Sequence, residues 1–195
     1  MPLPPIVHVG EPVLRARAND VAPDRIRTPE LQTLFKTMIA TMRAAPGVGL
    51  AAPQIDVPLR VIVLEDREEL MSRLSPAERR ERGRVPFDVR VVVNPALTPI
   101  GDDRATFFEG CLSVPGYAAL VERHREVEVT GLDERAAPVR WRVSGWPARI
   151  LQHEVDHVDG TVYVDRMITR SFATTEGASG FAGKSIAEIK RLLGL

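Results

Sequence analysis

The stretch PARILQHEVDHV, residues 147–158, predicts the helix around which the rest of the chain is arranged. Pro147 suits the first turn of a helix. Helical geometry places His153 and His157 one turn apart on the same face, where both imidazoles can bind one metal ion. Glu154 follows the first histidine, so its carboxylate can take a proton from a water that the metal holds. Two surface histidines also fall four residues apart by chance, so this motif alone leaves the metal site a hypothesis.

Helical spacing also marks both ends of the chain. Thr28 and Pro29 have the pattern of a helix cap and a first turn, and apolar residues follow at helical spacing to about Ala45, which predicts an N-terminal amphipathic helix. Residues 184–195 place apolar side chains on one helical face and predict a C-terminal helix. Residues 46–54 contain two glycines and two prolines, a composition that predicts a shaped loop.

Four further segments have the pattern of strands. Leu59–Glu65 and Asp88–Asn94 are rich in β-branched residues, whereas Arg125–Leu132 and Val139–Val143 alternate apolar with charged residues. These patterns predict antiparallel strands. The expected fold class is α+β, with mostly antiparallel strands packed around a central helix that bears the His-Glu-x-x-His motif.

Length and composition predict a single catalytic domain over residues 1–195, because 44% of the residues are apolar and can build one sizeable core. Residues 66–86 are highly charged and predict a surface insertion. Residues 174–183 are small and polar and predict a linker before the C-terminal helix.

Charge and hydropathy exclude several partners. The chain has 26 basic and 26 acidic side chains, so no net charge draws it to nucleic acid or to an anionic membrane. No segment approaches the length of about 18 apolar residues that a membrane span needs, and the Pro-rich start does not have the pattern of a signal peptide. We therefore expect a cytoplasmic protein that binds neither nucleic acid nor a membrane.

A catalytic metal site of the His-Glu-x-x-His type needs a third protein ligand and one open position. No histidine follows His157, and the downstream Glu176 and Glu188 fall in the predicted linker and C-terminal helix. Cys111 is the only cysteine, and the preceding Gly110 allows close approach of the backbone. A single cysteine is more often a small buried apolar residue, so both interpretations of this thiol stay open.

Three segments resemble, in order and spacing, the signature motifs of the peptide deformylases: GVGLAAPQ at residues 47–54, EGCLS at residues 109–113 and QHEVDH at residues 152–157. The resemblance extends from about Ile6 to Phe172. Residues 144–150 are most similar to the subgroup that includes the mitochondrial enzymes, although the start of the chain lacks the pattern of a transit peptide, which favours a bacterial cytoplasmic origin.

The resemblance implies an enzyme that removes the N-terminal formyl group from formyl-methionyl polypeptides and releases formate. It implies that Cys111, His153 and His157 bind one divalent metal, commonly Fe²⁺ in the cell. A thiolate and two imidazoles also suit Zn²⁺, Ni²⁺ or Co²⁺, and the sequence does not choose among them.

The resemblance also assigns catalytic roles. Glu154 acts as the acid and base, and the side-chain amide of Gln54 and the backbone N–H of Leu112 stabilise the oxyanion. Without the motif around it, Gln54 would be interpreted as a loop amide that caps its own backbone.

An apolar pocket for the methionine side chain is implied at Val48, Phe107, Trp146 and Ile150. Core packing explains Phe107 and Ile150 equally well. The peptide backbone is expected to pair with strand edges near Gly49 and Gly116.

The chain departs from the family pattern at two positions. Many bacterial members carry an arginine that holds the substrate backbone where this chain has Ala118, and Trp146 is bulkier than the leucine common at its position.

Arg123 matches a family arginine, and we predict an ion pair between it and Glu109. Asp156 is expected as a solvated helix residue, with support of a ligand as the alternative.

Two other functions fit the same residues. The first is a zinc metallopeptidase whose third ligand is a downstream glutamate, and the second is a non-catalytic metal or redox sensor that responds through Cys111.

The cations Lys184, Lys190 and Arg191 of the C-terminal helix suggest a transient contact with the ribosome, although packing on its own domain is the simpler role for this helix.

Overall fold

The computed structural model describes residues 2–72 and 74–195. The helices of this part of the chain are α1 (Pro29–Ala44), α2 (Pro76–Arg82), α3 (Gly145–Val158), α4 (Thr175–Ser179) and α5 (Ile186–Leu193). Its strands are β1 (Gly49–Ala51), β2 (Val61–Asp66), β3 (Phe87–Pro99), β4 (Arg104–Cys111), β5 (Val114–His124), β6 (Glu126–Leu132), β7 (Pro138–Ser144) and β8 (Ala173–Thr174).

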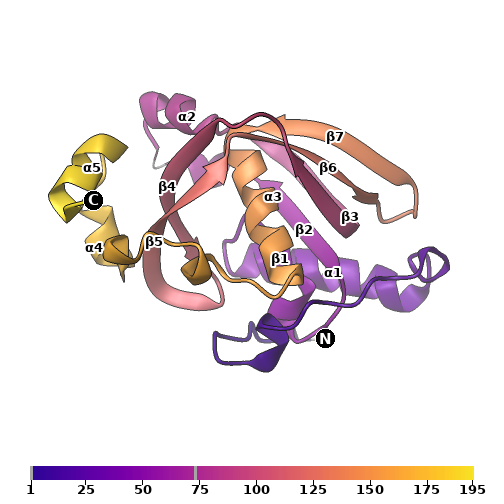
Figure 1. Cartoon of the computed structure of the whole chain (residues 1–195). Helices are drawn as coiled ribbons and strands as arrows, with labels where there is room; N and C mark the ends of the chain where they lie inside the picture. Colours follow the sequence, from indigo (N-terminus) through magenta and orange to yellow (C-terminus); the bar gives the residue numbers. More distant parts are fainter. Residues whose placement is uncertain (1, 73) are drawn as a thin grey trace.

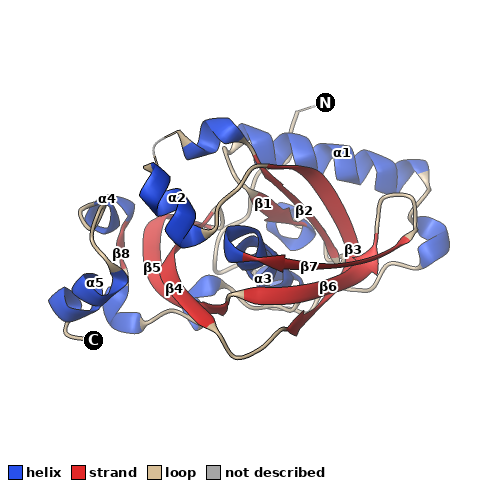
Figure 2. Cartoon of the chain, turned by 90° about the horizontal axis from the view of Figure 1, so that it is seen from above, coloured by secondary structure: helices blue, strands red, loops and turns tan. Residues whose placement is uncertain are grey.

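The strands form two antiparallel sheets. The larger has the order β1-β2-β3-β6-β7, and the smaller has the order β4-β5-β8. Figures 1 and 2 show α3 between the two sheets, with α1 on the outer face of the larger sheet. The expected α+β class with antiparallel strands and a C-terminal helix is confirmed.

Alternation along β2 and β3 produces this layering. Val61 and Val63 pack with α1 in one apolar cluster, whereas Ile62 and Leu64 pack with α3 in another. Successive side chains of a strand point to opposite faces, so a strand that is buried on both faces is continuously apolar. The run of β-branched residues in β2 therefore reflects a sheet that is covered on both sides.

Helix α1 begins where the sequence predicts. The Thr28 hydroxyl accepts a bond from the Leu31 N–H at 3.5 Å, and Pro29 occupies the first turn. Near its end, Arg43 donates two hydrogen bonds to Glu65 of β2, at 2.8 and 2.7 Å. This ion pair holds the end of the helix to the larger sheet and lowers the pKa of Glu65 through the hydrogen bonds from Arg43.

The prediction of a loop over residues 46–54 is wrong at its centre. Gly49–Ala51 pair with β2 as strand β1, and Ala52–Ile55 form a 3-10 helix. Local signals from glycine and proline are overridden here because β2 offers an edge with free backbone groups. Strand β1 is the edge strand of its sheet.

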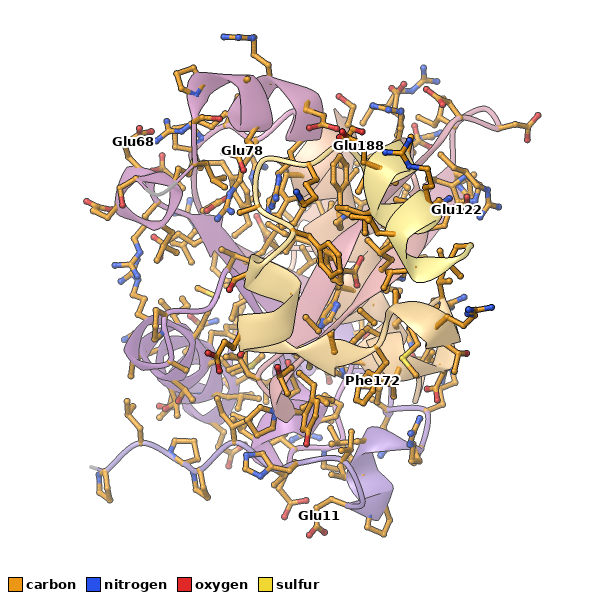
Figure 3. All side chains as sticks on the ribbon, turned by 90° about the vertical axis from the view of Figure 1, so that its left-hand side faces the viewer. Glu11, Glu68, Glu78, Glu122, Phe172 and Glu188 are labelled. Carbon is orange, nitrogen blue, oxygen red and sulfur yellow. The ribbon has the colours of Figure 1, made fainter. Side chains whose placement is uncertain are left out.

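Residues 174–183, expected as a linker, contain regular structure. Strand β8 pairs with Tyr117 and Ala118 of β5, and the Thr174 hydroxyl caps α4 by accepting from the Gly177 N–H at 3.0 Å. Figure 3 shows this C-terminal segment in front of the smaller sheet. The long-range strand pairing has no local signal in the sequence.

The charged residues 66–86 include α2, whose cap Ser75 shares reciprocal hydrogen bonds with Glu78. The segment is nevertheless anchored, since Asp66 and Met71 are completely buried. Among the described residues, no helix combines the length and the apolar character needed to cross a membrane.

Candidate active site

The end of β4 and one face of α3 bring together three potential metal ligands. One atom each from Cys111, His153 and His157 lies within 4.8 Å of the others. The Cys111 sulfur is 3.2 Å from Nε2 of His157, and the two imidazole rings are 5.1 Å apart. One thiolate and two imidazoles fit a divalent transition metal and leave a fourth tetrahedral position open.

A buried carboxylate orients the first histidine. Nδ1 of His153 lies 3.0 Å from Oε2 of Glu109, which leaves Nε2 free for a metal. Burial raises the pKa of Glu109, but His153 and Arg123 lower it by more, so the net pKa is well below the usual range. Arg123 donates to Glu109 at 2.9 and 3.0 Å, which confirms the predicted ion pair.

Asp156 is buried, contrary to the expectation of a solvated residue. It accepts hydrogen bonds from Arg123 and, at 2.7 Å, from both Nε and Nη2 of Arg166. The residue lies on the face of α3 that meets the smaller sheet, where Arg123 projects from β5. Asp156 therefore supports the arginine that in turn holds Glu109.

Glu154 is only 4% exposed, and its Oε2 has no hydrogen-bond partner among the described residues. Burial raises its pKa to about 7. Strand β1 passes directly against this side chain. A Cβ added to Gly49 would lie only 2.6 Å from the Glu154 carboxyl carbon. An unpartnered buried carboxylate oxygen is rare in proteins and marks a place for a reacting group or a water.

Gln54 combines the two roles considered for it. Its Oε1 accepts a bond from the Ala51 N–H at 2.9 Å, which is the local backbone cap. This bond fixes the amide so that Nε2 lies 3.2 Å from the Ser113 hydroxyl and 3.6 Å from the Cys111 sulfur. The donor end of the amide therefore faces the ligand cluster.

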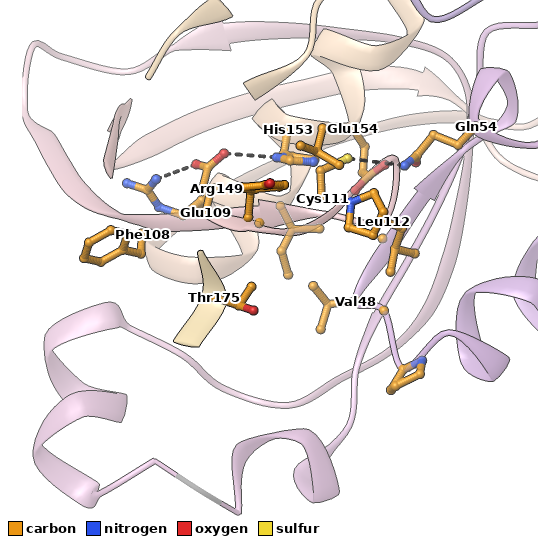
Figure 4. Close-up of a pocket in the computed structure, with 18 of the residues that line it drawn as sticks. Val48, Gln54, Phe108, Glu109, Cys111, Leu112, Arg149, His153, Glu154 and Thr175 are labelled. Carbon is orange, nitrogen blue, oxygen red and sulfur yellow. Dashed lines mark hydrogen bonds and ion pairs between the residues drawn. The ribbon is translucent and has the colours of Figure 1, made fainter. Parts of the chain in front are cut away.

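The cluster opens on a mostly apolar cavity of about 410 Å³ (Figure 4). Of the residues predicted for the site, those that line it are Val48, Gly49, Gln54, Cys111, Leu112, Gly116, Trp146, Ile150, His153 and Glu154. Two predicted residues do not line it: His157 is completely buried behind the cavity in the ligand cluster, and Phe107 is replaced by the next residue, Phe108. Alternation along β4 explains the difference, since neighbouring side chains point to opposite faces. Phe107 packs edge-on behind Trp146, with ring centroids 6.2 Å apart.

The sequence reasoning missed several residues at the cavity. Gly110 precedes the predicted ligand Cys111 and Arg149 precedes the predicted pocket residue Ile150, so their neighbours in the chain were the available signal. Tyr117 and Thr175 lie at the cavity because β5 pairs with β8, and this pairing has no recognisable pattern in the sequence. Glu188, one of the alternative third ligands, accepts hydrogen bonds from Ser185 at the start of α5.

A cysteine and two histidines beside an unpartnered buried glutamate and an apolar cavity are typical of metal-dependent hydrolases. Comparisons with known proteins identify the family within this class. Residues 3–172 match the family model described as Polypeptide deformylase. The chain belongs to the polypeptide deformylase family.

Relatives and solved structures agree with this assignment. The chain is 51% identical to the tomato (Solanum lycopersicum) chloroplastic peptide deformylase 1A over 174 residues, which cover 89% of this chain and 63% of that protein. It is 44% identical to the human mitochondrial peptide deformylase over 174 residues, covering 88% of this chain and 72% of the relative. A crystal structure of a class I type b peptide deformylase from Acinetobacter baumannii with Met-Ala-Ser bound is 34% identical, with a TM-score of 0.76 and coverage of 85% of this chain and 99% of that one.

Replacement of the thiol tests the ligand cluster without reference to any reaction. Cys111→Ala leaves two imidazoles, so we expect the bound metal to fall from about one ion per chain to well below half an ion. Metal content after loading and desalting, measured by atomic emission, gives the result. His8→Ala is the matched control because His8 is exposed and outside the cluster. Equal metal content in the wild type and Cys111→Ala would exclude the thiol as a ligand.

Proposed function

We propose that this chain is a metal-dependent hydrolase that removes the N-terminal formyl group from formyl-methionyl polypeptides and releases formate. The observation that carries the proposal is the free Oε2 of buried Glu154 beside the Cys111, His153 and His157 cluster, at the end of an apolar cavity. Family membership supports it, as does the Met-Ala-Ser bound to the Acinetobacter baumannii relative.

We infer that Cys111, His153 and His157 hold one divalent metal, Fe²⁺ in the cell, with Zn²⁺, Ni²⁺ or Co²⁺ as substitutes. A metal in this position supplies a Lewis acid and lowers the pKa of water. Glu109 and Arg123 contribute by holding the His153 ring so that Nε2 points to the cluster.

The roles of the chain's own residues follow from their contacts. Glu154 has an oxygen free to take a proton from the attacking water, and the same carboxyl group returns a proton to the leaving amine. Nε2 of Gln54, fixed through Ala51, and the backbone N–H of Leu112 donate to the oxyanion. The loss of one such donor typically lowers turnover about 100- to 1,000-fold.

The cavity suits an unbranched apolar side chain such as methionine. Val48, Trp146 and Ile150 line it, with Phe108 in the place expected for Phe107. We propose that the peptide backbone pairs with the free edge of β1 at Gly49 on one side and lies near Gly110 and Gly116 on the other. Backbone pairing of this kind tolerates many sequences beyond the first residue.

The alternative functions use fewer of these features. A metallopeptidase with a downstream glutamate ligand leaves Cys111 without a role, and Glu188 is engaged at its own helix start. A sensor leaves the free Glu154 oxygen and the fixed Gln54 amide without a role.

The whole of residues 1–195 is proposed to act as one catalytic domain in the bacterial cytoplasm, with formylated nascent peptides as partners. Related proteins occur in chloroplasts and mitochondria, so an organellar setting is the alternative. The match covers 63% of the length of the tomato relative.

Formate release tests the proposed reaction. Protein loaded with Ni²⁺ or, without oxygen, with Fe²⁺ is expected to release formate from formyl-Met-Ala-Ser, and Glu154→Gln is expected to lower kcat by about 100-fold or more because it removes the proton acceptor. Folded, metal-loaded wild-type protein that releases no formate would refute the proposal. Glu154→Gln should keep its metal, which separates loss of chemistry from loss of the site.

Gly49→Ala provides a second test through the contact between β1 and Glu154. The new Cβ would overlap the carboxyl group, so the side chain must move, and a displacement of about 1 Å can lower the rate roughly 100-fold. We expect Gly49→Ala to lower the rate of formate release by this factor in the wild-type background. In the Glu154→Gln background, Gly49→Ala should lower the rate little further. Additive losses in the double variant would show that Gly49→Ala acts elsewhere.

We also propose that α5 makes a transient contact with the ribosome. Lys184 and Arg191 are exposed, whereas Ile189 is buried and fixes the helix on the domain. Reversal of the charges at Lys184, Lys190 and Arg191 is expected to reduce co-sedimentation with bacterial ribosomes while formate release stays unchanged. Unchanged co-sedimentation would exclude this contact. Charge reversal is preferable to deletion after Ala173, because deletion removes Thr175 from the cavity.

A further inference from the structure

The segment between β2 and β3 is closed at its base by a buried ion pair. Asp66, at the end of β2, is completely buried and accepts two hydrogen bonds from Arg84, at 2.7 and 2.9 Å. Two parallel bonds between a guanidinium and a carboxylate fix the relative orientation of both groups. Asp66 and Arg84, which flank this segment, are therefore held together at the end of β2.

The end of α2 touches the start of α3 through backbone atoms. The Gly83 carbonyl accepts a bond from the Trp146 N–H at 3.4 Å. A Cβ on Gly145, whose φ is +69°, would lie 2.7 Å from the same carbonyl oxygen. The two glycines allow this close approach of the two backbones.

Arg82 covers the back of Trp146. Its guanidinium carbon lies 5.2 Å from the centroid of the Trp146 ring and 5.7 Å from that of Phe107. Arg84 lies 5.3 Å from the Trp146 ring. Arg82 forms no ion pair with the described residues, so these aromatic faces are its main contacts, and its burial there lowers its pKa. Attraction between a guanidinium and an aromatic face is expected at these distances.

Trp146 also belongs to the cavity wall, together with Ile150. The Trp146 side chain is therefore in contact with both the cavity and the end of α2. Arg149 of α3 also lies 5.9 Å from the centroid of this ring, so Arg82, together with Arg84 and Arg149, influences where the indole lies. The width of the cavity depends on that ring.

We propose that Arg82 is a positioning residue that holds Trp146 and thereby sets which first side chain the peptide can carry. The chemical class selected is a peptide whose first residue is long, unbranched and apolar, in preference to one with an aromatic ring. This inference rests on the proposed function, because it assigns the Trp146 cavity to the first side chain of the substrate.

Steady-state rates with two peptides test the proposal. We compare formyl-Met-Ala-Ser with formyl-Phe-Ala-Ser in the metal-loaded wild type, Arg82→Met, Arg82→Lys and Arg80→Ala. Arg80 is the matched control because it is an exposed arginine on the same helix. In Arg82→Met, the ratio of kcat/KM for the two peptides is expected to fall about tenfold, the size of discrimination that pocket fit supplies. This fall should come from a change in KM and not in kcat. Arg82→Lys keeps the positive charge, so its ratio of kcat/KM for the two peptides should stay closer to that of the wild type than the ratio of Arg82→Met does.

Acrylamide quenching of Trp146 fluorescence supplies a readout that is independent of the reaction. Trp141 is the other tryptophan, so the measurement uses a Trp141→Phe background. Quenching is expected to increase in Arg82→Met and to stay unchanged in Arg80→Ala. An unchanged peptide ratio or unchanged quenching in Arg82→Met overturns the proposal. A wild type that hydrolyses neither peptide would refute the proposed reaction, whereas the quenching result would still decide whether Arg82 holds Trp146.

Discussion

The carboxylate of Glu109 joins β4 to α3, and the geometry of the candidate site depends on this junction. Arg123 reaches it from β5, and Arg149 and His153 reach it from α3. Cys111 follows two residues later on the same strand, so the thiol is placed relative to the imidazoles by the same contacts. A buried ion pair adds little net stability, but removal of one partner typically costs about 3–5 kcal/mol because the other charge stays buried. The network therefore acts mainly to define position.

Helix α3 divides its faces between the two sheets. Ile150, Leu151 and Val155 pack against the larger sheet. The opposite face carries charged and ionisable side chains, which are buried and bonded to β4 and β5. Buried polar atoms nearly always have partners, so the exceptions are informative. On this helix they are Oε2 of Glu154, Nδ1 of His157 and Nε1 of Trp146, which belong to two residues at the ligand cluster and one in the cavity wall.

Patterns that are local in sequence could be predicted from it, and contacts between distant segments could not. The α1 cap at Thr28 and the motif of α3 depend on neighbouring residues. Strand β1 depends on a free edge of β2, and β8 depends on a free edge of β5, so neither has a local pattern. The wrong choice of Phe107 instead of Phe108 as a cavity residue has a different cause. Both positions hold phenylalanine, so only the strand register decides which side chain faces the cavity.

The same long-range pairing gives a physical setting for Ala118, where many relatives are expected to carry arginine. Ala118 is 7% exposed and pairs with Ala173 of β8, so a longer side chain there would meet the residues that cover it. Beside it, Tyr117 and Phe172 stack with centroids 5.1 Å apart, and each is 44% exposed. Thr175 follows at the cavity. At the position of that arginine, this chain therefore has a small buried residue beside an added strand, and the C-terminal segment forms part of the cavity wall through Thr175.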